Sequence, residues 1–197
     1  MGRTPPKEGK LLYHLTTMNN IENILKLGLL PRSELVAKGL VFDDTANQDI
    51  LLRRKEQALD EYVPFHFFIK NPYDGAQFKK HPETDFVYIT IYRKFLENSD
   101  KGFIIPKHPL SEAHHTLEVI PYAQGFDKID WDMLVLRNYS NQECKRACMC
   151  EALYKGMVPC EAFCGIKVKT LENKQKIDII ARKFRLECPI DLAETWF

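Results

Sequence analysis

The stretch Phe86-Val87-Tyr88-Ile89-Thr90-Ile91 is the clearest strand signal in this chain of 197 residues. β-branched and aromatic side chains occupy every one of its positions, and these residue types favour the pleated surface of a sheet. The stretch therefore predicts a β-strand near the middle of the chain and indicates a fold organised around a sheet.

Segments on both sides of this stretch predict the other elements. Short runs rich in strand-forming residues predict strands at residues 10–15, 62–68, 102–105, 117–120, 166–168 and 185–188. Helical patterns predict helices at residues 21–27, 33–38, 50–59, 93–96, 144–155 and 170–184, whereas residues 71–75 are typical of a turn. Strands dominate the centre and helices bracket them, so the fold class is α+β. We found no long linker and expect one domain, residues 1–197.

The composition is that of an ordinary globular protein, with 45% hydrophobic and 28% charged residues. No apolar run approaches the roughly 20 residues that are needed to cross a bilayer. Residues 1–10 are too polar to form the apolar core of a secretory signal. We therefore expect a cytoplasmic protein with no membrane partner.

The net charge of +1 does not by itself indicate a nucleic-acid-binding protein. Residues 165–185, however, carry seven basic residues and only two acidic ones, Glu172 and Asp178. Such a segment either follows the phosphates of a nucleic acid or forms the solvated face of a helix, and the sequence leaves both interpretations open.

Five of the six cysteines fall within residues 144–164, and the sixth is Cys188. Their spacing does not repeat the Cys-x2-Cys pattern of zinc sites, so the indication of a metal is weak. We expect buried free thiols that pack as small apolar side chains, and no metal.

Candidate catalytic residues lie near opposite ends of the chain. His14 and Thr16 alternate with Leu15, so they share one face of the predicted first strand. Glu151 lies between the basic Lys145-Arg146 pair and an apolar run that ends at Pro159. This order resembles that of mono-ADP-ribosyltransferases, which split NAD at its nicotinamide bond. The reaction develops positive charge on the ribose, and a carboxylate such as Glu151 could stabilise that charge or deprotonate the acceptor.

Four segments in the same order resemble the DarT family of DNA ADP-ribosyltransferase toxins, of which this chain looks like a divergent member. They are Tyr13-His14-Leu15-Thr16 with the following helix, Tyr62-Val63-Pro64-Phe65-His66-Phe67, the late segment from Ile129-Asp130-Trp131-Asp132 to Glu161, and Thr195-Trp196-Phe197. The resemblance covers almost the whole chain. It implies a single-domain ADP-ribosyltransferase-like fold with a central split β-sheet core bracketed by helices.

The resemblance also implies roles for individual residues. Glu151 would be the catalytic acid, and one of Arg53 and Arg54 would hold the NAD phosphates and assist catalysis, because the guanidinium fork matches phosphate oxygens. The sequence does not choose between these two arginines, and both are equally consistent with surface charges on a polar helix. The other implied NAD-binding residues are His14, Thr16, Asn20, Tyr62 and Phe67.

A base acceptor has to be single-stranded or flipped out of a duplex. Single-strand-binding proteins combine aromatic platforms with a basic groove. Aromatic and basic residues that interleave in this way near Glu151 or in predicted loops are candidates for nucleic-acid binding, with core packing as the alternative for each aromatic residue. The candidates are Lys79, Lys80, Tyr139, Lys145, Arg146 and Tyr154.

The resemblance predicts an NAD-dependent transferase that attaches ADP-ribose to a base of single-stranded DNA, releases nicotinamide and serves as a toxin or phage-defence effector. It implies NAD as co-substrate, no metal, a monomer, and a macrodomain-type antitoxin as partner. The alternatives are a transferase that acts on RNA or protein, or a non-catalytic nucleic-acid-binding or zinc-binding module. The chain departs from the family pattern at residues 71–76, where a Pro-Met-Leu-like run is usual, in the acidic loop before Tyr62, and in the cysteine-rich window before Glu151.

Overall fold

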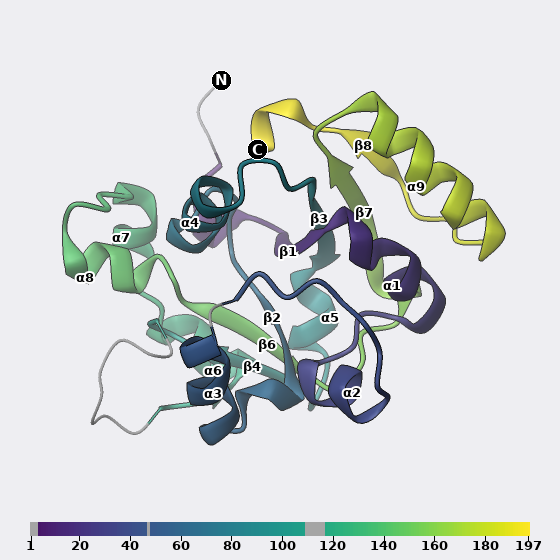
Figure 1. Cartoon of the computed structure of the whole chain (residues 1–197). Helices are drawn as coiled ribbons and strands as arrows, with labels where there is room; N and C mark the ends of the chain where they lie inside the picture. Colours follow the sequence, from purple (N-terminus) through teal and green to yellow (C-terminus); the bar gives the residue numbers. More distant parts are fainter. Residues whose placement is uncertain (1–3, 47, 109–116) are drawn as a thin grey trace.

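The computed structural model describes residues 4–46, 48–108 and 117–197 (Figure 1). Its first sheet has the strand order β1-β3-β7-β8. The strands are β1 (Leu11–Thr17), β3 (Phe86–Tyr92), β7 (Phe163–Val168) and β8 (Ile190–Leu192). β3 is antiparallel to both β1 and β7, whereas β8 runs parallel to β7. The predicted strand at residues 86–91 is confirmed, and only Tyr92 at the end of β3 is exposed.

The second sheet has the strand order β2-β6-β4-β5, and all its neighbouring strands are antiparallel. It consists of β2 (Tyr62–Phe65), β6 (Glu151–Lys155), β4 (Gly102–Ile105) and β5 (Ile120–Pro121). A backbone bridge between Tyr13 of β1 and His66, just after β2, connects the two sheets. The expected α+β fold with a split β-sheet core is therefore confirmed.

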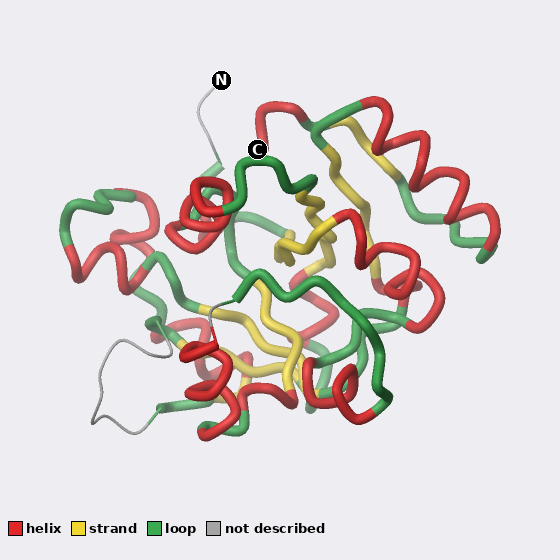
Figure 2. The backbone as a smooth tube through the Cα atoms, in the orientation of Figure 1, coloured by secondary structure: helices red, strands yellow, loops and turns green. Residues whose placement is uncertain are grey.

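Helices surround the two sheets (Figure 2). They are α1 (Ile21–Leu27), α2 (Arg32–Ala37), α3 (Gln48–Glu56), α4 (Pro72–Lys80), α5 (Arg93–Glu97), α6 (Tyr122–Gly125), α7 (Trp131–Leu136), α8 (Gln142–Ala147) and α9 (Leu171–Lys183). Helix α9 lies beside β7 and β8 at one edge of the molecule, and α7 and α8 lie together at the opposite edge (Figure 1). No helix among the described residues has both the length and the apolar character that a membrane crossing requires.

One large hydrophobic cluster takes side chains from both sheets. It includes Leu12 and Ile89 of the first sheet together with Val63 and Phe65 of the second, each no more than 1% exposed. Because both sheets contribute to the same core, the junction between them is held in place by packing as well as by the Tyr13–His66 bridge.

Three predicted elements were wrong. The helix expected at residues 144–155 is α8, which ends at Ala147, followed by strand β6. β6 is buried from Glu151 to Tyr154 and pairs with β2 on one side and β4 on the other, so tertiary pairing overrides the helix propensity of its residues. The turn expected at residues 71–75 is instead the start of α4, where the Asn71 side chain accepts hydrogen bonds from the backbone of Tyr73 and Asp74 in a capping box. The last strand is Ile190–Leu192 rather than 185–188.

Candidate active site

A cavity of about 560 Å³ lies at the junction of the two sheets and is lined by residues of both β1 and β2. This volume is within the range of pockets that hold cofactors. The polar side chains in its wall come from segments that are far apart in the sequence. They include His14, Thr16, Asn20, Arg54, Tyr62, His66, Tyr73, His108, Lys145, Arg146 and Glu151.

Arg54 and Glu151 form a buried two-pronged ion pair in the cavity wall. The Arg54 Nη1 atom donates to both carboxylate oxygens of Glu151, at 2.9 and 3.0 Å, and Nη2 donates to Oε2 at 3.1 Å. Glu151 is the first residue of β6, and Arg54 reaches it from the last turns of α3. Burial would raise the pKa of Glu151, but the charge and hydrogen bonds of Arg54 outweigh it and lower that pKa. The site therefore holds an ionised carboxylate.

His14 lies on the β1 side of the cavity in a defined tautomer. Its Nδ1–H donates to the backbone carbonyl of Pro64 at 2.8 Å, which leaves Nε2 as a hydrogen-bond acceptor. Burial lowers the pKa of His14 to about 4, so the ring is neutral near pH 7. Thr16 lines the same cavity, as the alternation along the strand predicts.

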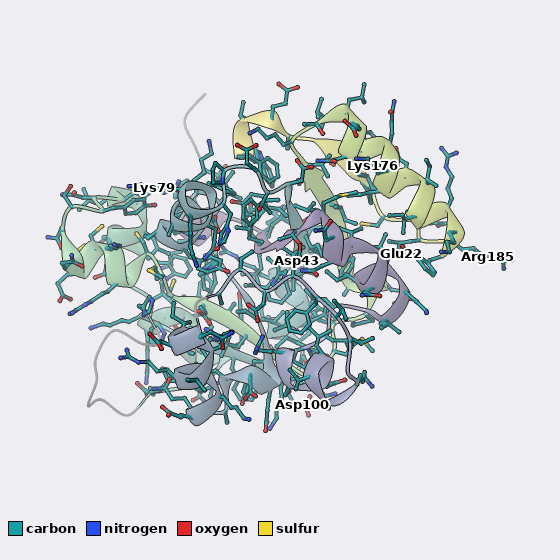
Figure 3. The ribbon with its side chains drawn as sticks, viewed as in Figure 1. Glu22, Asp43, Lys79, Asp100, Lys176 and Arg185 are labelled. Carbon is teal, nitrogen blue, oxygen red and sulfur yellow. The ribbon has the colours of Figure 1, made fainter. Side chains whose placement is uncertain are left out.

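A covering loop, residues 38–46, arches over the cavity between α2 and α3 and is drawn in green across the front of Figure 2. Asp43 is its main anchor and lies near the middle of the view in Figure 3. Asn20 accepts from the Asp43 backbone N–H at 2.8 Å and donates to its carbonyl at 3.0 Å, while Asn19 and Thr17 donate to its carboxylate at 2.7 and 3.1 Å. Arg32 of α2 pairs with Asp44, the next residue of the loop.

Asn20 also donates to the hydroxyl of Thr16 at 3.1 Å. One side chain thus connects the covering loop with a cavity-facing residue of β1. The three predicted NAD-binding residues of the N-terminal segment, His14, Thr16 and Asn20, are brought together in one wall of the cavity.

The structure separates the two candidate arginines. Arg54 lines the cavity and pairs with Glu151, whereas Arg53 points outward on the exposed side of α3 and does not line the cavity. Tyr62 lines the cavity, but Phe67 does not: it is 2% exposed and packs edge-on against Trp131 in the core. The burial of Phe67 leaves it outside the site that we propose.

The candidate nucleic-acid-binding residues fall into three groups. Lys145 and Arg146 of α8 lie at the margin of the cavity. Lys79 and Lys80 are at the end of α4, which Figure 3 marks by Lys79, and Tyr139 donates its hydroxyl to the carbonyl of Lys70 at 3.1 Å. Tyr154 is buried and stacks on Phe95 with 4.9 Å between ring centroids, so it offers no surface on which a base could stack.

The basic segment at residues 165–185 lies mostly on α9, away from the cavity. Its lysines form surface ion pairs with nearby carboxylates, Lys174 with Asp178 at 3.1 Å and Lys176 with Glu172 at 2.7 Å. None of the residues of α9 lines the cavity. This arrangement favours the interpretation as a solvated helix face.

Three of the cysteines are part of the core. Cys144, Cys148 and Cys150 are at most 1% exposed, and burial raises the pKa of the Cys148 thiol to about 12. The thiols of Cys144 and Cys148 both donate to the carbonyl of Met133, at 3.3 and 3.4 Å. Among the described residues, no group of three or more His, Cys, Asp or Glu side chains is arranged to hold a metal ion.

The sequence interpretation gave no role to the cavity residues Asp43, His66 and His108. His66 follows β2, and its ring packs against that of Tyr73, the second residue of α4, at 5.8 Å between centroids. His108 also lines the cavity, and burial lowers its pKa. The only hint in the sequence at a role for His66 was its polar side chain within the aromatic run at residues 62–68. Asp43 had no signal beyond the unusual acidity of its loop.

Comparisons with known proteins agree with this geometry. The family model described as "ssDNA thymidine ADP-ribosyltransferase, DarT" matches residues 13–197. The fold is similar to that of Thermus sp. 2.9 DarT in complex with ADP-ribosylated ssDNA, with a TM-score of 0.79, 20% identity and 100% of each chain covered. The same Thermus protein in complex with NAD+ gives a TM-score of 0.74 and 17% identity, with 96% of this chain and 98% of that chain covered.

Thermosipho africanus DarTG in complex with ADP-ribose is also similar, with a TM-score of 0.74 and 16% identity; the match covers 96% of this chain and 51% of that chain. None of the curated proteins matches this chain. These structural likenesses establish a shared fold, and the family match extends over nearly all of the sequence. The chain therefore belongs to the DarT family of ssDNA thymidine ADP-ribosyltransferases.

Proposed function

We propose that this protein splits NAD and transfers ADP-ribose to a thymine base of single-stranded DNA, releasing nicotinamide. The observation that carries the proposal is the buried Arg54–Glu151 pair in the wall of a 560 Å³ cavity. Membership of the DarT family supplies the activity class, and the printed descriptions of its structural relatives name NAD+ and ADP-ribosylated ssDNA.

In the proposed reaction, the bond between the ribose C1′ and the nicotinamide nitrogen breaks, and its electron pair leaves with nicotinamide. The positive charge that develops on the ribose is stabilised by the ionised carboxylate of Glu151. A thymine ring nitrogen then bonds to C1′, and its proton passes to the carboxylate of Glu151, which is ionised before this step. No metal takes part in this scheme.

Three other residues prepare NAD for this step. Arg54 is suited to the diphosphate, because its planar fork, which holds two oxygens of Glu151, matches paired anionic oxygens. The free Nε2 of neutral His14 is an acceptor for a ribose hydroxyl or for the nicotinamide amide. Asn20 contributes through the covering loop that it fastens over the cavity.

Lys145 and Arg146 supply positive charge at the cavity margin, which suits the backbone of a DNA strand whose base enters the cavity. Binding that rests on these phosphate contacts weakens as the salt concentration rises. An affinity that does not respond to salt would favour an acceptor other than nucleic acid.

The test is incubation of the purified protein with NAD and single-stranded oligonucleotides, followed by intact mass spectrometry. We expect the mass of one ADP-ribose on an oligonucleotide that contains thymine and none on a matched one that lacks it. Glu151→Gln should lower the rate by at least about 10³-fold while NAD still binds. Labelling of RNA or protein in place of DNA would assign a different acceptor, and an unchanged rate in Glu151→Gln would remove that residue from catalysis.

The biological setting is part of the proposal. The Thermosipho africanus DarTG chain is about twice as long as the region that this chain matches, and the family resemblance pairs such enzymes with a macrodomain-type antitoxin. We propose a toxin with a partner of that kind and a cytoplasmic location, where NAD and DNA meet. The family match over residues 13–197 supports one domain. Growth arrest on expression, relieved by a co-expressed macrodomain and absent in Glu151→Gln, would support this setting.

A further inference from the structure

The ladder between β2 and β6 ends one residue earlier than its register allows. Tyr62 pairs with Lys155 and Phe65 pairs with Ala152, so the next pair would be His66 with Glu151. The backbone of His66 instead turns to the other sheet, where its N–H and C=O bond to Tyr13 at 2.8 and 2.9 Å. Glu151 therefore begins β6 without a backbone partner on β2.

The side chain of His66 bridges this break. Its Nδ1–H donates to the carbonyl of Cys150 at 3.2 Å, and this carbonyl belongs to the peptide group that joins Cys150 to Glu151. His66 is 8% exposed and lines the cavity, and its ring lies against Tyr73 of α4. One residue thus fixes three neighbours: β1 through its backbone, the start of β6 through Nδ1, and α4 through its ring.

We infer that His66 is a positioning residue that sets the backbone, and hence the carboxylate, of Glu151. The inference rests on the proposed function, because Glu151 has to face the ribose of NAD within a fraction of an ångström. A small displacement of such a group is costly to the chemical step and leaves most of the binding contacts intact.

Two amide variants separate the two ring nitrogens. Asn places its amide nitrogen where Nδ1 of histidine lies, and Gln places it near Nε2. We expect His66→Asn to keep kcat within about 3-fold of the wild type. His66→Gln should lower kcat by about 10- to 100-fold and change the KM for NAD by no more than about 2-fold. Both variants are polar and similar in size, so a general loss of folding would affect them alike.

Hydrogen exchange of the backbone amides of residues 150–155 gives a second measurement that needs no reaction. Exchange should be faster in His66→Gln than in His66→Asn, whose rate should match the wild type. This measurement tests the role of His66 even if the wild-type protein labels no DNA. A lack of DNA labelling would contradict the proposed function and leave the exchange result unaffected.

Three results would overturn the inference. Equal exchange and equal kcat in both variants would mean that the bond to Cys150 does not set Glu151. An active Gln variant beside an inactive Asn variant would mean that Nε2 acts on the substrate directly. A change in KM with kcat preserved would make His66 a residue for binding NAD.

Discussion

Two regions of this molecule pair the same kinds of charge and differ almost entirely in what surrounds them. In the cavity, the side chains of Arg54 and Glu151 are 16% and 9% exposed. On α9, the side chains of Lys176 and Glu172 are 54% and 74% exposed. Figure 3 shows Lys176 on α9 and Arg185 just beyond the end of this helix at one flank, away from the central position of Asp43.

The difference explains why charge density along the sequence is a poor guide to this site. Water and salt screen the surface pairs of α9, which contribute little to stability or to binding. The buried pair is shielded from solvent, so each partner strongly affects the ionisation and orientation of the other. The charges that we propose for catalysis are single residues that stand 97 positions apart in the sequence.

The largest expected effect comes from two neighbouring arginines of α3 that differ in burial and in their contact with Glu151. Arg54→Lys keeps the charge but loses the fork, and we expect kcat/KM for NAD to fall about 10²-fold. Arg53→Lys, the matched control on the exposed side of α3, should stay within about 2-fold of the wild type. Steady-state transfer rates measure both. Equal losses in the two variants would show that burial does not distinguish these arginines.

The covering loop offers a similar pair of neighbours. Asn20→Ala removes both bonds to the Asp43 backbone and the bond to Thr16, so the KM for NAD should rise about 10-fold with a smaller change in kcat. Asn19→Ala removes one exposed bond to the Asp43 carboxylate, and the KM should rise about 2-fold at most. If the order of the two effects is reversed, the loop is not fastened mainly by its backbone.

The buried imidazole of His14 should make folding stability depend on pH. Its pKa falls from 6.5 in the unfolded chain to about 4 in the fold, so the unfolded state binds the proton more readily between these values. Stability is complete above pH 6.5, falls as the pH drops towards 4, and by pH 5 has lost up to about 2 kcal/mol from this group. His14→Asn keeps a donor for Pro64 and cannot titrate. Urea denaturation at pH 7.5 and pH 5 should therefore show a smaller difference in the variant than in the wild type.

The smallest effects are expected on α9. Lys176→Gln and Arg182→Gln should leave the KM for ssDNA within about 2-fold and the salt dependence of binding unchanged. Lys145→Gln, at the cavity margin, should weaken DNA binding and lower the slope of log K against log salt by about one. A lower slope in the α9 variants would place the DNA path along that helix and would contradict the difference between α9 and the cavity margin.

The class of the fold was predictable because its strongest signals are local. Residues 86–91 are β-branched or aromatic throughout, and residues 21–27 have helical spacing with a glycine at the end; both elements form as predicted. The helix prediction was wrong at residues 151–155 because Glu, Ala, Leu and Lys favour helices in isolation. Only pairing with β2 and β4, which come from elsewhere in the chain, makes this segment a strand.

The site was predictable only in part, for a related reason. His14, Thr16 and Glu151 lie in segments that resemble a known family, and the structure places all three in the cavity wall. The choice of Arg54 over Arg53 depends on which side of α3 faces β6, and no local pattern in the sequence encodes that. Asp43 and His66 matter because of what they touch, so their roles became visible only with the fold.

The position of Glu151 at the start of β6 has a consequence for how the protein is made. A ribosome completes His14, Arg54 and His66 well before it reaches this acid, and β7, which pairs with β3, comes later still. Until β6 is made, β2 and β4 lack the strand that pairs with both of them, so a growing chain cannot complete the second sheet. Synthesis that stops before residue 151 leaves a fragment without the acid that we propose for catalysis, so interrupted translation should give an inactive product.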